Sequence, residues 1–273
     1  ISPKNKKVKA PKIDINSDAG KLLAIKSPAI NVRNLGYEAI KGSSNAKDLI
    51  HTLLNETDAY VKSRAVYLLS VIEPGQCLQF LSDKNENIRI AAFRALKNKS
   101  EYLMQAIDTL LQIPRPAILR EIAISIRDLP YENSKSILEY LIKNYPGNDI
   151  WYDAAFAIAC DGKEEKVYTD FLVEKTKAKN WSDTLCHQLF ILHTPSSVSA
   201  LYTQLQHQPV NTGQNEKLIT TLAFINDTNA VKSMIGLSQS KDSMIEPRLF
   251  GGSISDALMI GHLYTIGLKL ILI

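Results

Sequence analysis

Five stretches of the chain share one pattern of apolar and polar positions. They begin at Val32, Val61, Ile88, Leu119 and Trp151, at intervals of 29, 27, 31 and 32 residues. In each stretch the first position is apolar and the sixth is apolar or aromatic. The fifth position carries a small residue every time: Gly36, Ala65, Ala92, Ala123 and Ala155. Because positions one and five share a face of an α-helix, the pattern predicts helices whose small residue lies where a neighbouring helix comes close.

The stretches between these copies are also helical in period, and no run of the chain alternates like a β-strand. Examples are "NAKDLIHTLLN", "GQCLQFLS", "EYLMQAIDTLLQI" and "SKSILEYLIKN". Each repeat is therefore predicted to be a helix pair, with Asp58, Asn85 and Asn148 as N-caps. Pairs of about 30 residues stack because they cannot bury their own apolar faces. The predicted fold class is all-α, an α-solenoid of HEAT-like helix pairs forming a right-handed superhelix of the armadillo/HEAT type.

The chain is predicted to have three parts. Residues 1–16 are expected to be a linker from an upstream domain, and residues 17–246 the HEAT-like repeat domain, with a weaker pattern after Trp151. Residues 247–273 form an atypical apolar tail. A membrane segment is a poor interpretation of the tail, because Asp256, His262 and Lys269 interrupt it. A frameshift product and a genuine, poorly packed tail remain open.

Charge argues against a nucleic-acid-binding body. The formal net charge is +4, and five lysines stand before the first acidic residue, so the rest of the chain is close to neutral. These lysines are Lys4, Lys6, Lys7, Lys9 and Lys12. The first residue is Ile and no signal-peptide pattern follows, which predicts a fragment or a processed chain.

Four of the five copies carry a basic residue at their second position. These residues are Arg33, Lys62, Arg89 and Arg120, while the fifth copy has Tyr152. A row of cations on a concave face could bind phosphates or a carboxylate-bearing partner. Alternatively, each cation could pair with an Asp, an Asn or a carbonyl group of the adjoining repeat. The second interpretation is favoured, because one basic residue per repeat is what stacking requires.

The stretch "GNDIWYDAAFAIACDGKEEKVY" crowds polar and aromatic residues together, yet it predicts packing more than chemistry. Trp151 occupies the first position of its repeat, so it is expected in the core. Asp161-Gly162 indicates a helix end, and Cys160 has no neighbouring base that would form a thiolate. Cys77, Cys160 and Cys186 are expected to be buried small hydrophobes. No His pair has metal-ligand spacing and no glycine-rich phosphate loop is present, so no catalytic residue, cofactor or metal site is predicted.

Several segments together resemble the HEAT-repeat region of large bacterial membrane-bound dehydrogenases. They are "KSPAINVRNLGYEAIKG", "NIRIAAFRAL", "ILREIAISIRDLP", "YPGNDIWYDAAFAIACDGKEEKVY" and "TLAFINDTNAVKSM", and the likeness spans about residues 1–247. In that family a propeller resembling glucose/sorbosone dehydrogenase precedes the repeats, and a c-type cytochrome with C-x-x-C-H follows them. The resemblance implies a periplasmic or cell-envelope parent oxidoreductase with a quinone-type cofactor and haem c. Neither site falls in the residues of this chain.

The predicted function is a non-catalytic helical-repeat scaffold that spaces or docks the propeller and cytochrome domains of a dehydrogenase. The partners are then neighbouring domains of the same polypeptide. A free-standing HEAT module that binds another protein is the first alternative. A nucleic-acid-binding HEAT protein of the DNA-glycosylase type is less favoured, because the repeat body is nearly neutral.

Overall fold

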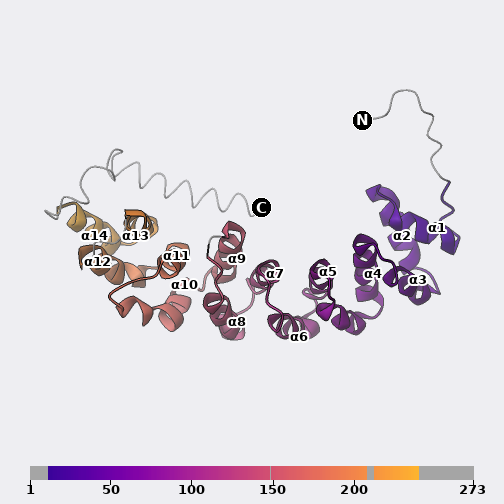
Figure 1. Ribbon diagram of the computed structural model, residues 1–273, viewed down its shortest axis with the longest axis horizontal. Coiled ribbons are helices and arrows are strands. Elements are labelled where there is room, and N and C mark those ends of the chain that lie inside the picture. The colour runs from indigo at the N-terminus through magenta and orange to yellow at the C-terminus, as the bar shows by residue number, and fades with distance from the viewer. Residues whose placement is uncertain (1–11, 148, 208–211, 240–273) are drawn as a thin grey trace, which may run out of the picture. The chain divides into compact units, whose positions relative to one another are not determined.

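The computed structural model describes residues 12–147, 149–207 and 212–239, and these ranges contain helices and no strand. Figure 1 shows helices α1 to α6 following one another in chain order. The chain divides into two compact units, Ile1–Glu121 and Ile122–Ile273, here called unit 1 and unit 2. Residues 1–11 of the predicted linker and the whole predicted tail, 247–273, lie outside the described residues.

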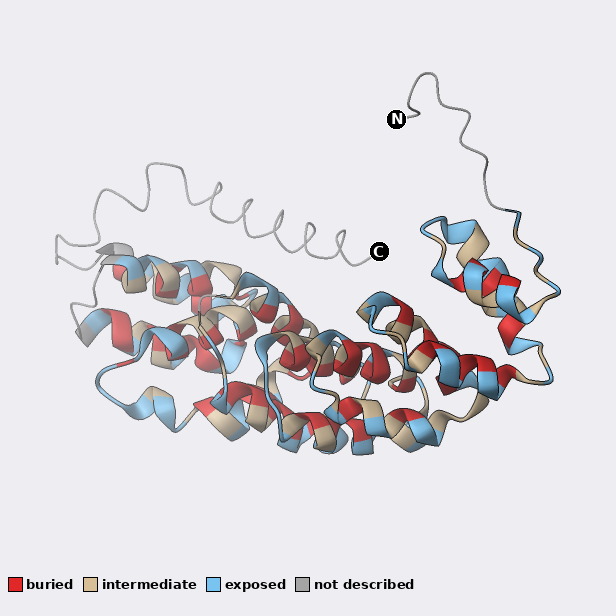
Figure 2. Cartoon of the chain, turned by 45° about the vertical axis from the view of Figure 1, so that its right-hand side comes forward, coloured by how far each residue is buried: buried red, intermediate tan, exposed pale blue. Residues whose placement is uncertain are grey.

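Unit 1 is a series of short helices that pack against their neighbours in the chain. Contacts also join α2 to α4 and α4 to α5, so successive pairs stack side by side. Buried residues lie where these helices face one another (Figure 2). The elements are α1 (Asp18–Lys26), α2 (Ile30–Lys41), α3 (Ala46–Leu54), α4 (Ala59–Ile72), the 3₁₀ helix η1 (Pro74–Ser82), α5 (Glu86–Leu96), α6 (Ser100–Leu111) and α7 (Pro116–Ser125), which reaches into unit 2.

Local sequence signals start the repeat helices of unit 1 where they were expected. The Asp58 carboxylate accepts hydrogen bonds from the backbone N–H groups of Tyr60 and Val61, and the Asn85 side chain accepts one from Asn87. These contacts satisfy backbone donors that have no partner within a helix. Both predicted N-caps are confirmed.

The small residues of the repeat pattern are buried, as the pattern predicted. Gly36 shows the physical reason most clearly. A β-carbon added there would lie 2.5 Å from the backbone nitrogen of Ile25 and 2.9 Å from the β-carbon of Ala24. Helices α1 and α2 therefore cross so closely that only a hydrogen atom fits between them.

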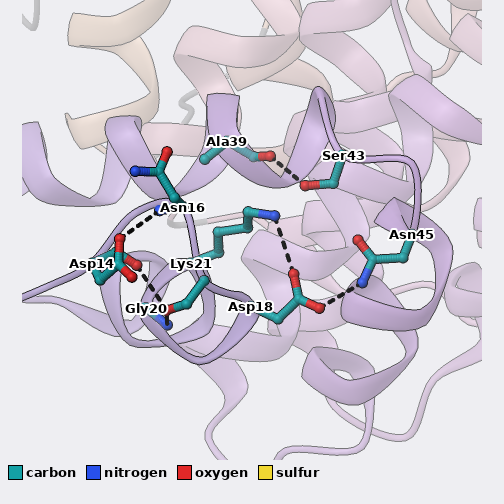
Figure 3. A network of polar contacts seen from close by, with 9 residues as sticks. Asp14, Asn16, Asp18, Gly20, Lys21, Ala39, Ser43 and Asn45 are labelled. Atoms are coloured by element: carbon teal, nitrogen blue, oxygen red, sulfur yellow. Dashed lines mark hydrogen bonds and ion pairs between the residues drawn. The ribbon is translucent and has the colours of Figure 1, made fainter.

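Polar contacts fix the start of unit 1 (Figure 3). The Ser17 hydroxyl accepts a hydrogen bond from the backbone N–H of Gly20 at 3.1 Å and so caps α1. The Asn45 amide donates to the Asp18 carboxylate at 2.7 Å, which ties the start of α3 to the start of α1. Gly20 admits no side chain, because its β-carbon would overlap the carbonyl of Asp14. Ser17 and Asp18, at the start of α1, therefore hold this end of the first repeat together.

Unit 2 continues the helix pairs with less regular connections. Helix α9 contacts α11, α11 contacts α13, and α12 contacts both α13 and α14. The elements are α8 (Tyr131–Lys143), α9 (Ile150–Cys160), α10 (Glu164–Val167), the π-helix η2 (Tyr168–Leu172), the 3₁₀ helices η3 (Lys175–Lys177) and η4 (Pro195–Ser197), α11 (Asp183–Leu192), α12 (Val198–His207), α13 (Thr212–Phe224) and α14 (Thr228–Gln239). The helix pairs expected after Trp151 on a weak pattern are therefore present.

The predicted fold class, an all-α solenoid of HEAT-like helix pairs, is confirmed for the described residues. One expected helix differs in kind, because "GQCLQFLS" lies in a 3₁₀ helix. It begins with Pro74 and runs for nine residues, which is long for a 3₁₀ helix. No helix within the described ranges is long and apolar enough to cross a membrane.

Candidate functional site

Three of the four predicted basic residues contact turns that lead into repeat helices. The Arg33 guanidinium donates to the carbonyl oxygens of Ser27 at 3.2 Å and Pro28 at 2.6 Å. The Lys62 ammonium donates to an Asp83 carboxylate oxygen at 2.8 Å. The Arg89 guanidinium donates to the Asp83 carbonyl oxygen at 2.7 Å. The Lys62 contact joins α4 to the turn that leads into α5, as a stack-linking role requires, whereas the Arg33 and Arg89 contacts stay within the turn that leads into their own helix.

Burial separates these basic residues further. Arg89 is buried, whereas Arg33 and Lys62 are half-buried, and the fourth residue, Arg120, lies half-buried on α7. A buried guanidinium that already donates to carbonyl groups is poorly placed to bind a phosphate from solution.

The prediction that Trp151 packs in the core is wrong, because 70% of this residue is exposed. The expected N-cap, Asn148, is also wrong. The Asp149 carboxylate caps α9 by accepting from the N–H groups of Trp151 and Tyr152 at 3.0 and 3.1 Å. This cap makes Trp151 the second residue of its helix.

The error follows from a one-residue change of register. Val61 and Ile88 are each the third residue of their helix after the caps Asp58 and Asn85. In α9 the third residue is Tyr152, which is 1% exposed and takes the core position that was assigned to Trp151.

Exposed bulky apolar side chains recur at the amino ends of repeat helices. The first or second residues of α2, α4 and α9 leave at least 63% of their surface in solvent. They are Ile30 and Tyr60 in unit 1, and Ile150 and Trp151 in unit 2, here called the amino-end apolar residues. Burying such side chains, Trp and Tyr above all, supplies much of the free energy of protein–protein association. Each unit therefore presents candidate partner contacts at the starts of its repeat helices.

A chain of polar contacts crosses three helices of unit 2, α9, α11 and α13, of which α11 contacts the other two. Tyr145, in the loop before α9, donates its hydroxyl to one oxygen of Asp153 on α9. The other Asp153 oxygen lies 2.8 Å from Nε2 of His187 on α11. Nδ1 of His187 lies 2.8 Å from the ammonium nitrogen of Lys217 on α13. These four side chains are here called the α9–α11–α13 polar network.

The donors of this network fix the tautomer of His187. An ammonium group only donates hydrogen bonds, so Nδ1 of the imidazole accepts from Lys217. The Nε2–H group then donates to Asp153, and the imidazole is neutral. The imidazole therefore lies between the Lys217 ammonium and the Asp153 carboxylate and joins them by hydrogen bonds.

Aromatic rings enclose one side of the network. The Tyr145 ring lies 5.3 Å from that of Tyr152 and 5.9 Å from the imidazole of His187, measured between centroids. Burial, followed by the hydrogen bond to Asp153, raises the pKa of Tyr145. The Tyr145 hydroxyl therefore stays protonated and donates a hydrogen bond to Asp153. The arrangement joins helices and does not turn this hydroxyl into a nucleophile.

Sequence reasoning did not find the network. It tested the histidines only as metal pairs within one helix, a test that His187 fails. The available signal was spacing: Asp153 and His187 are 34 residues apart, and His187 and Lys217 are 30 apart. Both intervals are about one repeat, so the three side chains occur on consecutive repeats.

The three cysteines are free, buried thiols. Burial raises the pKa of Cys77 to about 12 and that of Cys186 to about 11, and it also raises the pKa of Cys160. A thiol held in the protonated form is a weak nucleophile at neutral pH. Within the described part of the chain, no three His, Cys, Asp or Glu side chains are grouped so that they could hold a metal ion.

No protein-family model matches the chain, and no curated protein matches it. Among solved structures, the complex of CpcE and CpcF of phycocyanin lyase from Nostoc sp. PCC7120 is similar over 87% of this chain and 98% of that chain. The sequence identity is 13% and the TM-score is 0.36. A likeness this distant carries no statement about ligand, partner or activity.

Proposed function

We propose that this chain is a non-catalytic helical-repeat scaffold that binds a protein partner through its amino-end apolar residues. The observation that carries the proposal is the recurrence of Ile30, Tyr60, Ile150 and Trp151 as exposed side chains at the starts of repeat helices. These exposed side chains add little to the packing of the fold, whereas a bound partner would remove them from water.

The partner is a neighbouring domain of the same polypeptide. This part of the proposal is supported by the resemblance of the repeat segments to the HEAT region of bacterial membrane-bound dehydrogenases. The repeats then space or dock a propeller with its quinone-type cofactor and a cytochrome domain with haem c. The same resemblance supports a periplasmic or cell-envelope location for the parent protein.

The coding sequence on both sides of residues 1–273 provides the first test. A propeller sequence upstream and a C-x-x-C-H motif downstream are the expected result. Their absence would overturn the dehydrogenase assignment and leave the free-standing protein-binding module as the function.

Binding measurements provide the second test, with the full chain titrated against each purified flanking domain. We expect Tyr60→Ser or Trp151→Ser to weaken at least one of these complexes about tenfold, because each change removes a large apolar contact. Met104→Ser is the matched control, since Met104 is exposed on α6 and lies outside this set. Equal affinities for all four proteins would refute the assigned contact residues.

A further inference from the structure

We propose that the α9–α11–α13 polar network is a pH-dependent link between helices. A second proton on His187 releases Lys217 and loosens α13 from α11, while α9 stays attached to α11. The inference goes beyond the scaffold function and does not depend on the identity of any partner.

The geometry gives the two contacts of His187 opposite responses to that proton. The proton must enter at Nδ1, since Nε2 already carries a hydrogen that it donates to Asp153. Nδ1 then stops accepting the hydrogen bond from Lys217, and two cations face each other across 2.8 Å. The imidazolium and the Asp153 carboxylate, in contrast, attract each other more strongly than the neutral ring did. Acid therefore weakens the contact to α13 and strengthens the contact to α9.

Other ionisable groups near the ring do not reverse this response. Tyr145 faces it from the loop before α9 and carries no charge at neutral pH, because its pKa is raised. On α11 itself, Asp183 accepts a hydrogen bond from Gln214 of α13. On η2, which also contacts α11, Asp170 pairs with Lys135. Asp183 and Lys217 line the same cavity of about 270 Å³, but one oxygen of the Asp183 carboxylate is already taken by Gln214.

The direction of the pH effect follows from a comparison of two states, one with α13 docked on α11 and one with α13 undocked. Asp153 faces His187 in both states, whereas Lys217 faces it only when α13 is docked. The docked state therefore binds the extra proton more weakly than the undocked state. Docking must then weaken when His187 takes up that proton.

Hydrogen–deuterium exchange of the full chain tests the link directly. Backbone amides of α13 are compared with those of α4 at pH 7.5 and 5.5, after correction for intrinsic exchange rates. The ratio of α13 protection to α4 protection should fall about two- to tenfold at pH 5.5, the size of one lost hydrogen bond. An unchanged ratio would overturn the proposal.

Variants assign the response to the network. His187→Gln keeps an acceptor for Lys217 and a donor for Asp153 without titrating, and Lys217→Gln removes the opposing cation. Both variants should show a flat ratio between the two pH values. His51→Gln is the matched control, because His51 lies exposed on α3 of unit 1, and it should keep the wild-type response. A pH response retained in His187→Gln would refute the assignment.

A measurement on the wild-type protein guards against variants that fold poorly. Imidazole ¹⁵N chemical shifts at pH 7.5 distinguish the two tautomers of a neutral histidine. We expect His187 to carry its hydrogen on Nε2 and none on Nδ1. The opposite tautomer would refute the proposal, whichever result the variants give.

Discussion

Units 1 and 2 stack helix pairs of the same kind, but they join successive repeats by different chemistry. In unit 1 the links are ion pairs of long side chains, at least partly in solvent and spaced 26 to 30 residues apart. They join Lys26 to Glu56, Lys47 to Glu73, and Arg94 to Glu121. Unit 2 also has surface ion pairs, such as Lys166 with Glu132, but it adds more enclosed links. These include the α9–α11–α13 polar network and a hydrogen bond from buried Gln188 to the Ile142 carbonyl at 3.0 Å.

Lys163 is the clearest case of an enclosed link. Only 7% of it is exposed, and its ammonium donates to the carbonyl oxygens of Ile126, Arg127 and Ala159 at 3.1, 2.6 and 3.0 Å. Burial lowers the pKa of this lysine. The cation thereby closes the carbonyl ends of two helical segments.

The difference explains why the repeat pattern is regular in one unit and weak in the other. A surface ion pair tolerates variation around a repeating core, so unit 1 keeps one apolar pattern from copy to copy. An enclosed polar link needs particular partners at particular positions, so each repeat of unit 2 carries its own residues. Helix pairing is common to both units, whereas sequence periodicity follows the kind of link.

Alkaline pH should produce the largest contrast between the units. Burial is the main cause that raises the pKa of Tyr131, Tyr145, Tyr152 and Cys160 in unit 2, and that of Cys186 to about 11. In the unfolded chain, thiols ionise near about pH 8.5 and tyrosines near about pH 10. The unfolded state then releases protons that the folded state keeps, so stability falls as the pH rises past those values.

We expect unit 2 to unfold first on this titration, because unit 1 holds fewer groups of this kind. Both tryptophans of the chain, Trp151 and Trp181, lie in unit 2, so their fluorescence reports on that unit alone. The fluorescence transition should precede much of the loss of far-ultraviolet circular dichroism. Coincident transitions would remove this contrast between the units.

Two aromatic residues of α9, Trp151 and Phe156, test the corrected register of this helix. Phe156→Ala should lower the free energy of unfolding by about 3–5 kcal/mol, because the ring is fully buried. Trp151→Ala should change it by less than about 0.5 kcal/mol, because its side chain lies in solvent. Urea unfolding followed by circular dichroism measures both values. A large cost for Trp151→Ala would restore the register that the sequence pattern suggested.

Much of the fold could be predicted because its signals are local and periodic. Apolar spacing located the helix pairs, small residues marked the close crossings, and Asp58 and Asn85 marked helix starts. The Trp151 position failed because Asp149, and not Asn148, caps α9, so the first core position of this helix falls on Tyr152, while Ala155 is buried as the pattern predicted. A cap is decided by backbone geometry, which the sequence pattern does not contain.

The candidate site was less predictable than the fold. The basic residues were identifiable because they repeat within the apolar pattern. The polar network was not, since Tyr145, Asp153, His187 and Lys217 become neighbours only when three helices stack. Each residue alone is ordinary for a helix surface, and only the spacing of about one repeat hinted at their contact.

Overpacking a close helix crossing tests how tightly the helices of unit 1 approach each other. It should lower the free energy of unfolding by less than a core deletion does. Ala92→Leu should destabilise the protein by about 1–3 kcal/mol, because Ala92 is fully buried and its neighbours must shift. Asn87→Leu on the same helix is the control, since Asn87 is exposed, and it should change stability by less than about 0.5 kcal/mol. Thermal unfolding monitored by circular dichroism compares the two. A neutral Ala92→Leu would mean that unit 1 is not held by close helix approach.

The surface ion pairs of unit 1 should give the smallest effect. The Arg94 guanidinium contacts both oxygens of Glu121, with Nε donating at 2.9 Å, and the Arg94 side chain is about half exposed. Water and salt screen such a pair, so the coupling free energy between Arg94→Gln and Glu121→Gln should be about 0.2–1 kcal/mol. Because the Debye length shrinks to about 3 Å in 1 M salt, the coupling should nearly vanish there. A double-mutant cycle of urea unfolding in low and high NaCl measures it. A coupling well above 1 kcal/mol that persisted in 1 M NaCl would show that unit 1, like unit 2, depends on specific polar links, and the proposed reason for its regular sequence pattern would fail.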